Sequence, residues 1–204
     1  MKKLLLSVLV AALMITPLGV VASAENVGPS APQAEESYAP GQVPARFTVA
    51  EAMGPAVHAV ALAMMSRDVT SFDPADPALA WDALYNMLSM YGQLDSRSDY
   101  RDELLVIPSE TVFDYAAAIL PDLSVLGDLP DELADRMTYD AETDSYLVVC
   151  GSDSLAEVRA QSAGNVLTGS LVYLVDGSEL TGFEAVLAPA DTMFGRAIVS
   201  LELN

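Results

Sequence analysis

Apolar and polar residues alternate along the C-terminal third of the chain, as they do on a β-strand with one buried face. In the last such stretch Ala197, Val199 and Leu201 fall on one face, whereas Ser200 and Glu202 fall on the other. This alternation predicts a C-terminal strand whose buried face carries Val199.

The chain from Arg136 onward repeats this pattern and predicts a meander of antiparallel strands. Asp176-Gly177, Gly164-Asn165 and Ala141–Asp144 are hairpin turns by composition, because Gly, Asn and Asp tolerate positive φ. The strands predicted around these turns are Met137–Asp140, Ser145–Cys150, Thr168–Val175, Phe183–Leu187 and the C-terminal stretch, with Leu104–Ile107 as a short strand further upstream. One polar and one apolar face indicate that helices cover one side of the sheet.

Helical periodicity and helix-end signals occupy the chain before this meander. Thr48 and Glu51 have the spacing of a capping box, and Pro55 either kinks the helix that follows or lies in its first turn. The stretch Ala56–Met65 is apolar on every side except His58, which predicts burial against several neighbours, and it is too short for a membrane span. Two further helices are predicted from their start and stop signals: Asp76 and Pro77 to Gly92, and a Ser109 cap to Pro121.

Together these elements predict an α+β fold with three N-terminal helices packed on a curved antiparallel sheet of about six strands. Residues 47–204 are expected to form a single domain. Residues 1–24 have the charge, apolar core and Ala-Ser-Ala site of a signal peptide that is cleaved after Ala24. Residues 25–46 are rich in proline and acidic residues, which predicts a disordered linker. The expected location is therefore extracytoplasmic, either secreted or in the cell envelope.

The order of helix, helix, short strand, helix and antiparallel meander resembles the cystatin-like fold called NTF2-like. This resemblance implies a pocket between helices and sheet that contains ionisable groups, with Asp114 or Tyr115 as candidates. A second resemblance, to uncharacterised exported proteins of Gram-positive bacteria, implies an exported location and no particular activity. It rests on these segments: Leu105–Pro108 with Val112 and Tyr115-Ala116, Tyr139-Asp140, and Asp144–Tyr146.

The charge of the chain limits its partners. The formal net charge is −20, and removal of Lys2 and Lys3 with the signal peptide leaves 29 acidic residues against seven arginines, a formal charge of −22. Such a field repels nucleic acids and anionic membranes, so neither is expected as a partner after signal cleavage. A cationic or protein partner remains possible, although acidity also simply keeps an exported protein soluble.

No catalytic, cofactor or metal residue is assigned from the sequence. The chain has one histidine, His58, and one cysteine, Cys150, which is too few for a typical zinc site. Burial is the better interpretation of both residues, although a Cys150–His58 pair stays open. Calcium could use the acidic turns, and this alternative includes two groups of carboxylates: Asp140, Glu142 and Asp144, and Asp95, Asp99, Asp102 and Glu103.

The sequence therefore favours a non-enzymatic binding or interaction module without a cofactor. The alternatives are an NTF2-like ligand-binding or enzymatic domain, and an envelope-associated structural domain assisted by calcium. The ligand, the strand order, the oligomeric state and the state of Cys150 stay open.

Overall fold

The computed structural model describes residues 47–151 and 155–204, so the predictions for residues 1–24 and 25–46 lie outside the described residues. The described chain is α+β, as predicted. Its helices are α1 (Val49–Ser66), α2 (Pro77–Tyr91) and α3 (Ser109–Ile119), with short 3₁₀ turns at Gly92–Leu94, Leu123–Val125 and Asp131–Leu133. Its strands are β1 (Asp99–Arg101), β2 (Leu104–Pro108), β3 (Met137–Asp140), β4 (Ser145–Val149), β5 (Ala156–Ala163), β6 (Val166–Tyr173), β7 (Glu179–Pro189) and β8 (Arg196–Leu203).

Helix α1 begins at the predicted capping box and continues through Pro55. The Thr48 side chain accepts a hydrogen bond from the Glu51 N–H, and the Glu51 carboxylate accepts one from the Thr48 N–H at 2.7 Å. The helix is 18 residues long, and by length and composition alone it could cross a membrane. The predicted apolar stretch Ala56–Met65 is only part of this helix, so the argument from its length does not extend to the whole of α1. Half of the helix is buried within the fold, however, which is also the behaviour of a core helix.

The ends of the other two helices agree with prediction in one case and differ in the other. Asp76 caps α2 by accepting from the N–H groups of Ala78 and Leu79, and Pro77 is the first helical residue. Ser109, in contrast, is not the cap of α3 but its first residue, because Pro108 occupies the cap position. The Ser109 N–H donates instead to the carbonyl oxygen of Asp144 at 3.0 Å, which ties the start of α3 to the β3–β4 turn.

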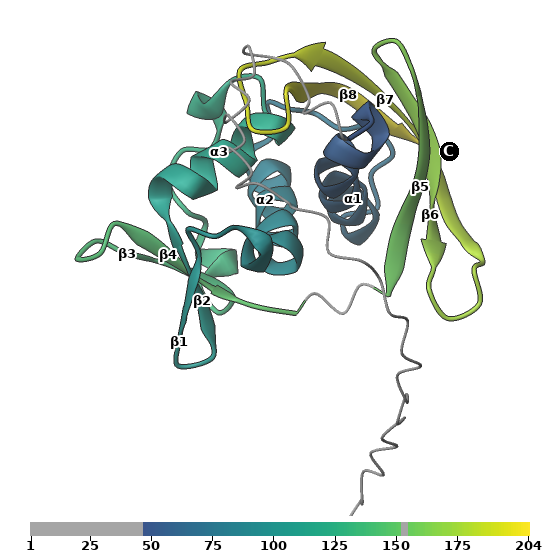
Figure 1. Ribbon diagram of the computed structural model, residues 1–204. Helices are drawn as coiled ribbons and strands as arrows, with labels where there is room; N and C mark the ends of the chain where they lie inside the picture. Colours follow the sequence, from purple (N-terminus) through teal and green to yellow (C-terminus); the bar gives the residue numbers. More distant parts are fainter. Residues whose placement is uncertain (1–46, 152–154) are drawn as a thin grey trace, which may run out of the picture. The chain divides into compact units, whose positions relative to one another are not determined.

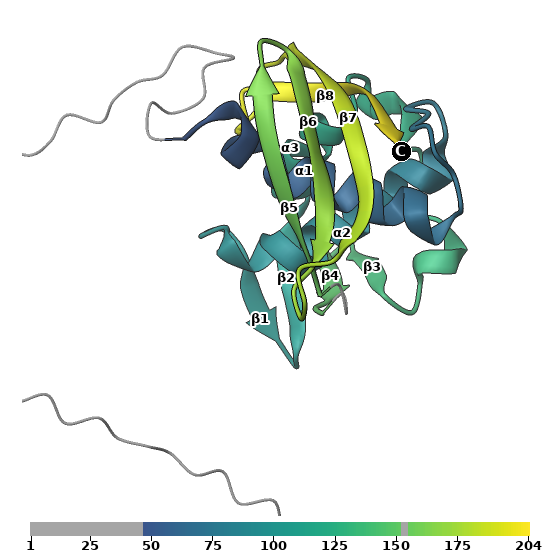
Figure 2. The same cartoon turned by 90° about the vertical axis from the view of Figure 1, so that its right-hand side faces the viewer.

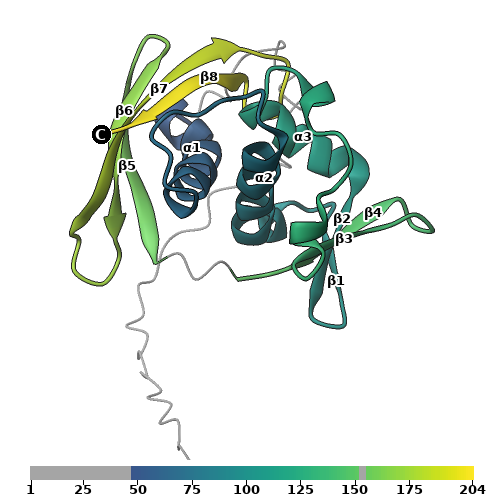
Figure 3. The same ribbon diagram turned by 180° about the vertical axis from the view of Figure 1, so that it is seen from behind.

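The prediction of one sheet of about six strands is wrong, because the strands form two antiparallel sheets of four. The first has the order β1-β2-β4-β3, and the second has the order β5-β6-β7-β8. Figure 1 shows α1 and α2 side by side between the two sheets, and Figure 3 shows the same arrangement from behind. Figure 2 looks onto the outer face of the second sheet, in which β5 is one edge strand.

The space between the sheets is filled by a continuous apolar core, to which all three helices contribute. Large side chains with less than 2 % exposure come from the helices and both sheets: Trp81, Met53, Met64, Leu84, Met87, Leu88, Ile119, Leu105, Ile107 and Phe183. The helix layer therefore has two apolar faces, one for each sheet, which agrees with the nearly uniform apolar character of α1.

A β-bulge in β8 overturns the predicted face of Val199. Leu187 is opposite Ile198 but Val186 is opposite Ser200, so Val199 is the additional residue in the pairing with β7. The side chain of Ile198 is fully buried as a consequence, whereas Val199 is 43 % exposed. A single inserted residue shifts the alternation by one position, which a periodicity argument cannot detect.

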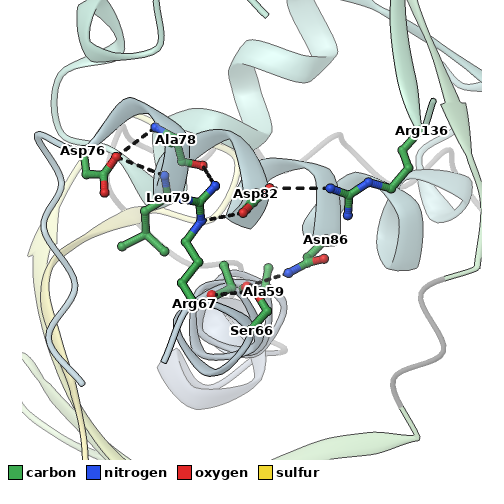
Figure 4. Close-up of polar contacts among 10 residues, drawn as sticks. Ala59, Ser66, Arg67, Asp76, Ala78, Leu79, Asp82, Asn86 and Arg136 are labelled. Carbon is green, nitrogen blue, oxygen red and sulfur yellow. Dashed lines mark hydrogen bonds and ion pairs between the residues drawn. The ribbon is translucent and has the colours of Figure 1, made fainter. Parts of the chain in front are cut away.

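A group of polar contacts joins α1 and Arg67, which follows it, to α2 (Figure 4). The Arg67 Nε atom, just after α1, is 2.6 Å from a carboxylate oxygen of Asp82 in α2. The Arg136 guanidinium approaches the other oxygen of this carboxylate at 3.9 Å and lies over the ring of Tyr85. In the same region the Asn86 side chain donates to the carbonyl oxygen of Ala59 at 3.3 Å. These contacts fix α2 against α1 and against the start of β3, so we interpret them as structural.

Two glycines should respond in opposite ways to replacement by alanine. A Cβ atom at Gly169 in β6 would clash with the carbonyl oxygen of Arg159, so Gly169→Ala must push β5 away from β6. We expect a loss of about 1–3 kcal/mol in the free energy of unfolding, measured by urea titration.

Gly54 in α1 has open space around its Cβ position, so Gly54→Ala should raise the free energy of unfolding by about 0.5–1 kcal/mol. Equal effects of the two substitutions would contradict the close β5–β6 approach.

Candidate functional site

A groove of about 610 Å³ runs between the edge strand β5 and the N-terminal half of α1. One wall consists of Ala156, Val158 and Ala160 of β5, and the other of Ala50 and Gly54 of α1, with Tyr91 at one end. We call this the β5 groove. Glu157 also lines the β5 wall, but the short side chains of Ala156 and Ala160 leave room beside the strand backbone.

The register of the β5–β6 hairpin determines which backbone groups of β5 face the groove. The first pair of the β5–β6 register is Ala156 and Tyr173, so the next residues outward, Leu155 and Leu174, are also directly opposite each other. They form a hydrogen-bonded pair, because the Leu174 N–H donates to the carbonyl oxygen of Leu155 at 2.6 Å. Hydrogen-bonded and non-hydrogen-bonded pairs alternate in an antiparallel ladder. Residues 157, 159 and 161 therefore bond to β6, whereas the N–H and C=O groups of Val158 and Ala160 point away from β6 toward the open edge.

This open edge contrasts with the opposite edge of the same sheet. At β8 the Phe72 N–H donates to the carbonyl oxygen of Leu201, and the Leu203 N–H donates to that of Thr70, both at 2.8 Å. The segment before α2 thus covers part of β8 through a single β-bridge between Ser71 and Glu202. At Val158 and Ala160, in contrast, no backbone hydrogen bond to another part of the described chain is present. An uncovered edge strand is a template for pairing with another extended chain.

The α1 wall adds space and negative charge to the β5 groove. The Cβ position of Gly54 has no heavy atom within 4 Å, so the groove is open above this turn of the helix. The Glu51 carboxylate accepts hydrogen bonds from the backbone and side chain of Thr48, and these bonds hold the pKa of Glu51 below its usual value. Glu51 is therefore ionised at neutral pH. Across the groove Glu157 is paired with Arg159 at 2.6 Å on the outer face of the sheet.

A second hollow of about 510 Å³ adjoins the groove, because Tyr91 and Ala156 line both. The rest of its wall is formed by His58, Ser89, Met90, Gln93, Cys150 and Gly151. We call it the Tyr91 hollow. It lies where the C-terminal end of α2 meets the middle of α1 and the residue that follows β4.

Two ionisable side chains of the Tyr91 hollow, His58 and Tyr91, are uncharged at neutral pH. The Nδ1 atom of His58 is 2.7 Å from the hydroxyl oxygen of Tyr91. Burial lowers the pKa of His58 from 6.5 to about 4, because desolvation disfavours the imidazolium ion. Burial likewise raises the pKa of Tyr91 above its usual value. His58 and Tyr91 therefore present a neutral imidazole and a neutral hydroxyl to the hollow, beside the amide of Gln93 and the thioether of Met90.

The structure brings together the two residues of the open Cys150–His58 alternative, since both line the Tyr91 hollow. Cys150 is half-buried and follows β4 directly, so it is more accessible than the buried residue predicted. Its Sγ atom is 3.8 Å from the hydroxyl oxygen of Tyr100, which also donates to Gln93 Oε1 at 3.0 Å. These contacts hold the thiol at the rim of the hollow.

The two candidates from the NTF2-like resemblance lie outside both the groove and the hollow. The Asp114 carboxylate is on the surface, 2.6 Å from a nitrogen of the Arg97 guanidinium. The same guanidinium also pairs with Asp95. Tyr115 is buried against Phe194, with ring centroids 5.6 Å apart, and burial raises its pKa to about 12. Both residues have packing and pairing roles in this arrangement.

Two carboxylates of the first acidic group considered for calcium, Asp140 and Asp144, accept hydrogen bonds within the chain. Asp140 accepts from the backbone of Glu142 and the hydroxyl of Thr143, and it pairs with Arg101 at 3.2 Å. Asp144 accepts from the Tyr139 hydroxyl at 2.8 Å. Within residues 47–151 and 155–204, no cluster of three or more His, Cys, Asp or Glu side chains could hold a metal ion. Asp140 and Asp144 therefore act as acceptors within the β3–β4 turn, and in the second group Asp95 pairs with Arg97 at 2.9 Å.

Comparisons of this chain with protein-family models, with curated proteins and with solved structures found no match. The interpretation of the site therefore depends on its geometry. Strand β5 was not predicted from the sequence, because the stretch Ala156–Ala163 has few β-branched or large apolar residues. The hairpin turn at Gly164-Asn165 could have indicated β5, because a two-residue hairpin turn requires a strand on each side.

Proposed function

We propose that this protein is a peptide-binding module that accepts an extended, basic segment of a partner protein as an additional strand at β5. The observation that carries the proposal is the open edge at Val158 and Ala160, whose outward backbone groups face a groove walled by α1. Strand addition uses such backbone groups for affinity and alternate side chains for specificity.

The alternation of side chains along a strand defines what the bound segment should look like. Ligand residues opposite Val158 and Ala160 direct their side chains toward α1, where Ala50 and Gly54 leave room for small apolar groups. The residues between them direct their side chains to the outer face of the sheet. On that face the charges nearest to the ligand, Glu157 and Arg159, form an ion pair, so the negative field there comes from the net charge of the whole chain. The groove therefore fits alternating apolar and basic residues.

Charge also decides between a basic peptide and a second copy of this chain at the same edge. Two copies would each bring a formal charge of −20, and like charges repel on approach. A basic segment is attracted by the same field, which increases its association rate. Antiparallel addition is the expected orientation, because the whole sheet is antiparallel and antiparallel pairing is the more stable form.

The probe for this proposal is an eight-residue peptide of alternating lysine and valine, added to the full chain. Amide hydrogen exchange followed by NMR should show slower exchange at Val158 and Ala160 when the peptide binds. Ala160→Pro removes an N–H that points to the open edge and leaves the bonds to β6 intact, so the fold should persist. Peptide binding should weaken roughly tenfold or more, because an inter-chain hydrogen bond is lost and the proline ring obstructs pairing.

Two controls separate strand addition from general electrostatic attraction. Ala160→Gly keeps the N–H and should keep most of the affinity, whereas Gly54→Leu should fill the groove and weaken binding without disturbing the core. A peptide with glutamate in place of lysine should not bind. The proposal fails if Ala160→Pro binds as tightly as the unchanged protein, if the glutamate peptide binds equally well, or if sedimentation shows that β5 is already paired in a dimer.

A further inference from the structure

We infer that the Tyr91 hollow receives a large, uncharged side chain at the C-terminal end of the segment bound at β5. The inference rests on the proposed function and specifies its ligand class. The continuity of the two sites supports it, because Tyr91 and Ala156 line both the β5 groove and the Tyr91 hollow.

The position follows from the direction of the strands. Strand β5 runs from Ala156 to Ala163, so an antiparallel ligand runs from the Ala163 end toward Ala156. The C-terminal residues of the ligand therefore reach the end of the groove at which Tyr91 and Ala156 lie. A side chain directed toward the helices at this point enters the hollow instead of the shallow part of the groove beside Gly54.

The chemistry of the wall selects an uncharged occupant. A lysine or arginine side chain would lose water on entry without gaining an ionised partner, because the hollow is lined by neutral His58, Met90, Tyr91 and Gln93. A carboxylate would likewise lose water without gaining a cationic partner, and the negative net charge of the protein would repel it. The thioether of Met90 and the ring of Tyr91 suit an aromatic or long aliphatic side chain. The bound segment thus combines basic residues along β5 with an apolar anchor at its C-terminal end.

Cys150 provides a specific reporter for this hollow, since it is the only cysteine of the chain and lies in the wall. The experiment measures the rate at which neutral iodoacetamide alkylates the full chain with and without peptide. The probes are amidated peptides of alternating lysine and valine that end in phenylalanine, glycine or lysine. With the phenylalanine peptide at about ten times its dissociation constant, alkylation should slow roughly tenfold.

The glycine peptide is the matched control, and it should leave the alkylation rate nearly unchanged while still slowing amide exchange at Val158 and Ala160. Met90→Trp should fill the hollow and remove the preference for phenylalanine over glycine, while binding at β5 persists. If the phenylalanine peptide protects the β5 amides but not the thiol, the inference about the hollow is wrong and the proposed function stands. If no peptide protects the β5 amides, the proposed function itself is wrong.

Discussion

Trp81→Ala should lower the free energy of unfolding by about 3–5 kcal/mol, a large share of the 5–15 kcal/mol typical of a domain. The Trp81 side chain is 1 % exposed, and its indole N–H donates to the carbonyl oxygen of Leu126 at 2.6 Å. Its ring also packs on Tyr146 of β4, with centroids 6.1 Å apart. Alanine at this position would leave a cavity between α2 and the first sheet and a carbonyl group without its donor.

Trp81→Phe separates the two contributions, because phenylalanine keeps most of the apolar volume and lacks the N–H. We expect a smaller loss of about 1–3 kcal/mol, set mainly by the Leu126 carbonyl group. Both variants should be measured by urea unfolding with circular dichroism, since Trp81 is the only tryptophan and fluorescence would lose its probe. A loss below about 1 kcal/mol for Trp81→Ala would contradict close packing between α2 and β4.

The second large effect is a loss of stability in acid that depends on His58. Its pKa is about 4 in the folded protein and close to 6.5 when it is exposed, so the unfolded chain binds the proton more tightly. The contribution of neutral His58 is fully present above about pH 6.5 and is lost progressively as the pH falls toward 4. The linked change amounts to about 3 kcal/mol in the free energy of unfolding.

His58→Asn is the reference for this measurement, because asparagine can approach the Tyr91 hydroxyl and does not titrate. Carboxylates titrate in both proteins, so the difference between the two unfolding curves isolates His58. The advantage of the unchanged protein over His58→Asn should shrink as the pH is lowered from about 7.5 to 4.5. Because His58 is the only histidine, its ring proton resonances also report its pKa directly. A titration midpoint near 6.5 would contradict the buried, neutral imidazole.

Local chemistry was sufficient to predict the start of α1, the ends of α2 and the three hairpin turns. The Thr48–Glu51 capping box, the Asp76 cap and the turn at Asp176-Gly177 depend on contacts between residues close in sequence. Each of these signals acts within a few residues, so it needs no knowledge of the rest of the fold. Ser109 was the exception, because it was predicted as the cap of α3 and is instead the first helical residue. Its N–H donates to the carbonyl oxygen of Asp144, which is distant in sequence.

The candidate site was less accessible from the sequence, because its walls come from distant segments. His58 and Cys150 could be named as single residues, but only the fold places both at the Tyr91 hollow. Strand β5 was missed because Val158 is its one β-branched residue, and its place in the sheet comes from pairing with β6. The outward groups at Val158 and Ala160 follow from that register alone.

By itself, then, the amino-acid sequence determined the α+β class, the strong acidity and the local boundaries of helices and hairpins. The tertiary structure alone decided that the strands divide into two sheets, that Val199 lies in a bulge, and that one sheet edge is covered while the other is open. The physical reason is that periodicity specifies which face of a strand is buried but not which strand pairs with it. Pairing partners are chosen by packing across the whole core, and in this protein that choice created the β5 groove.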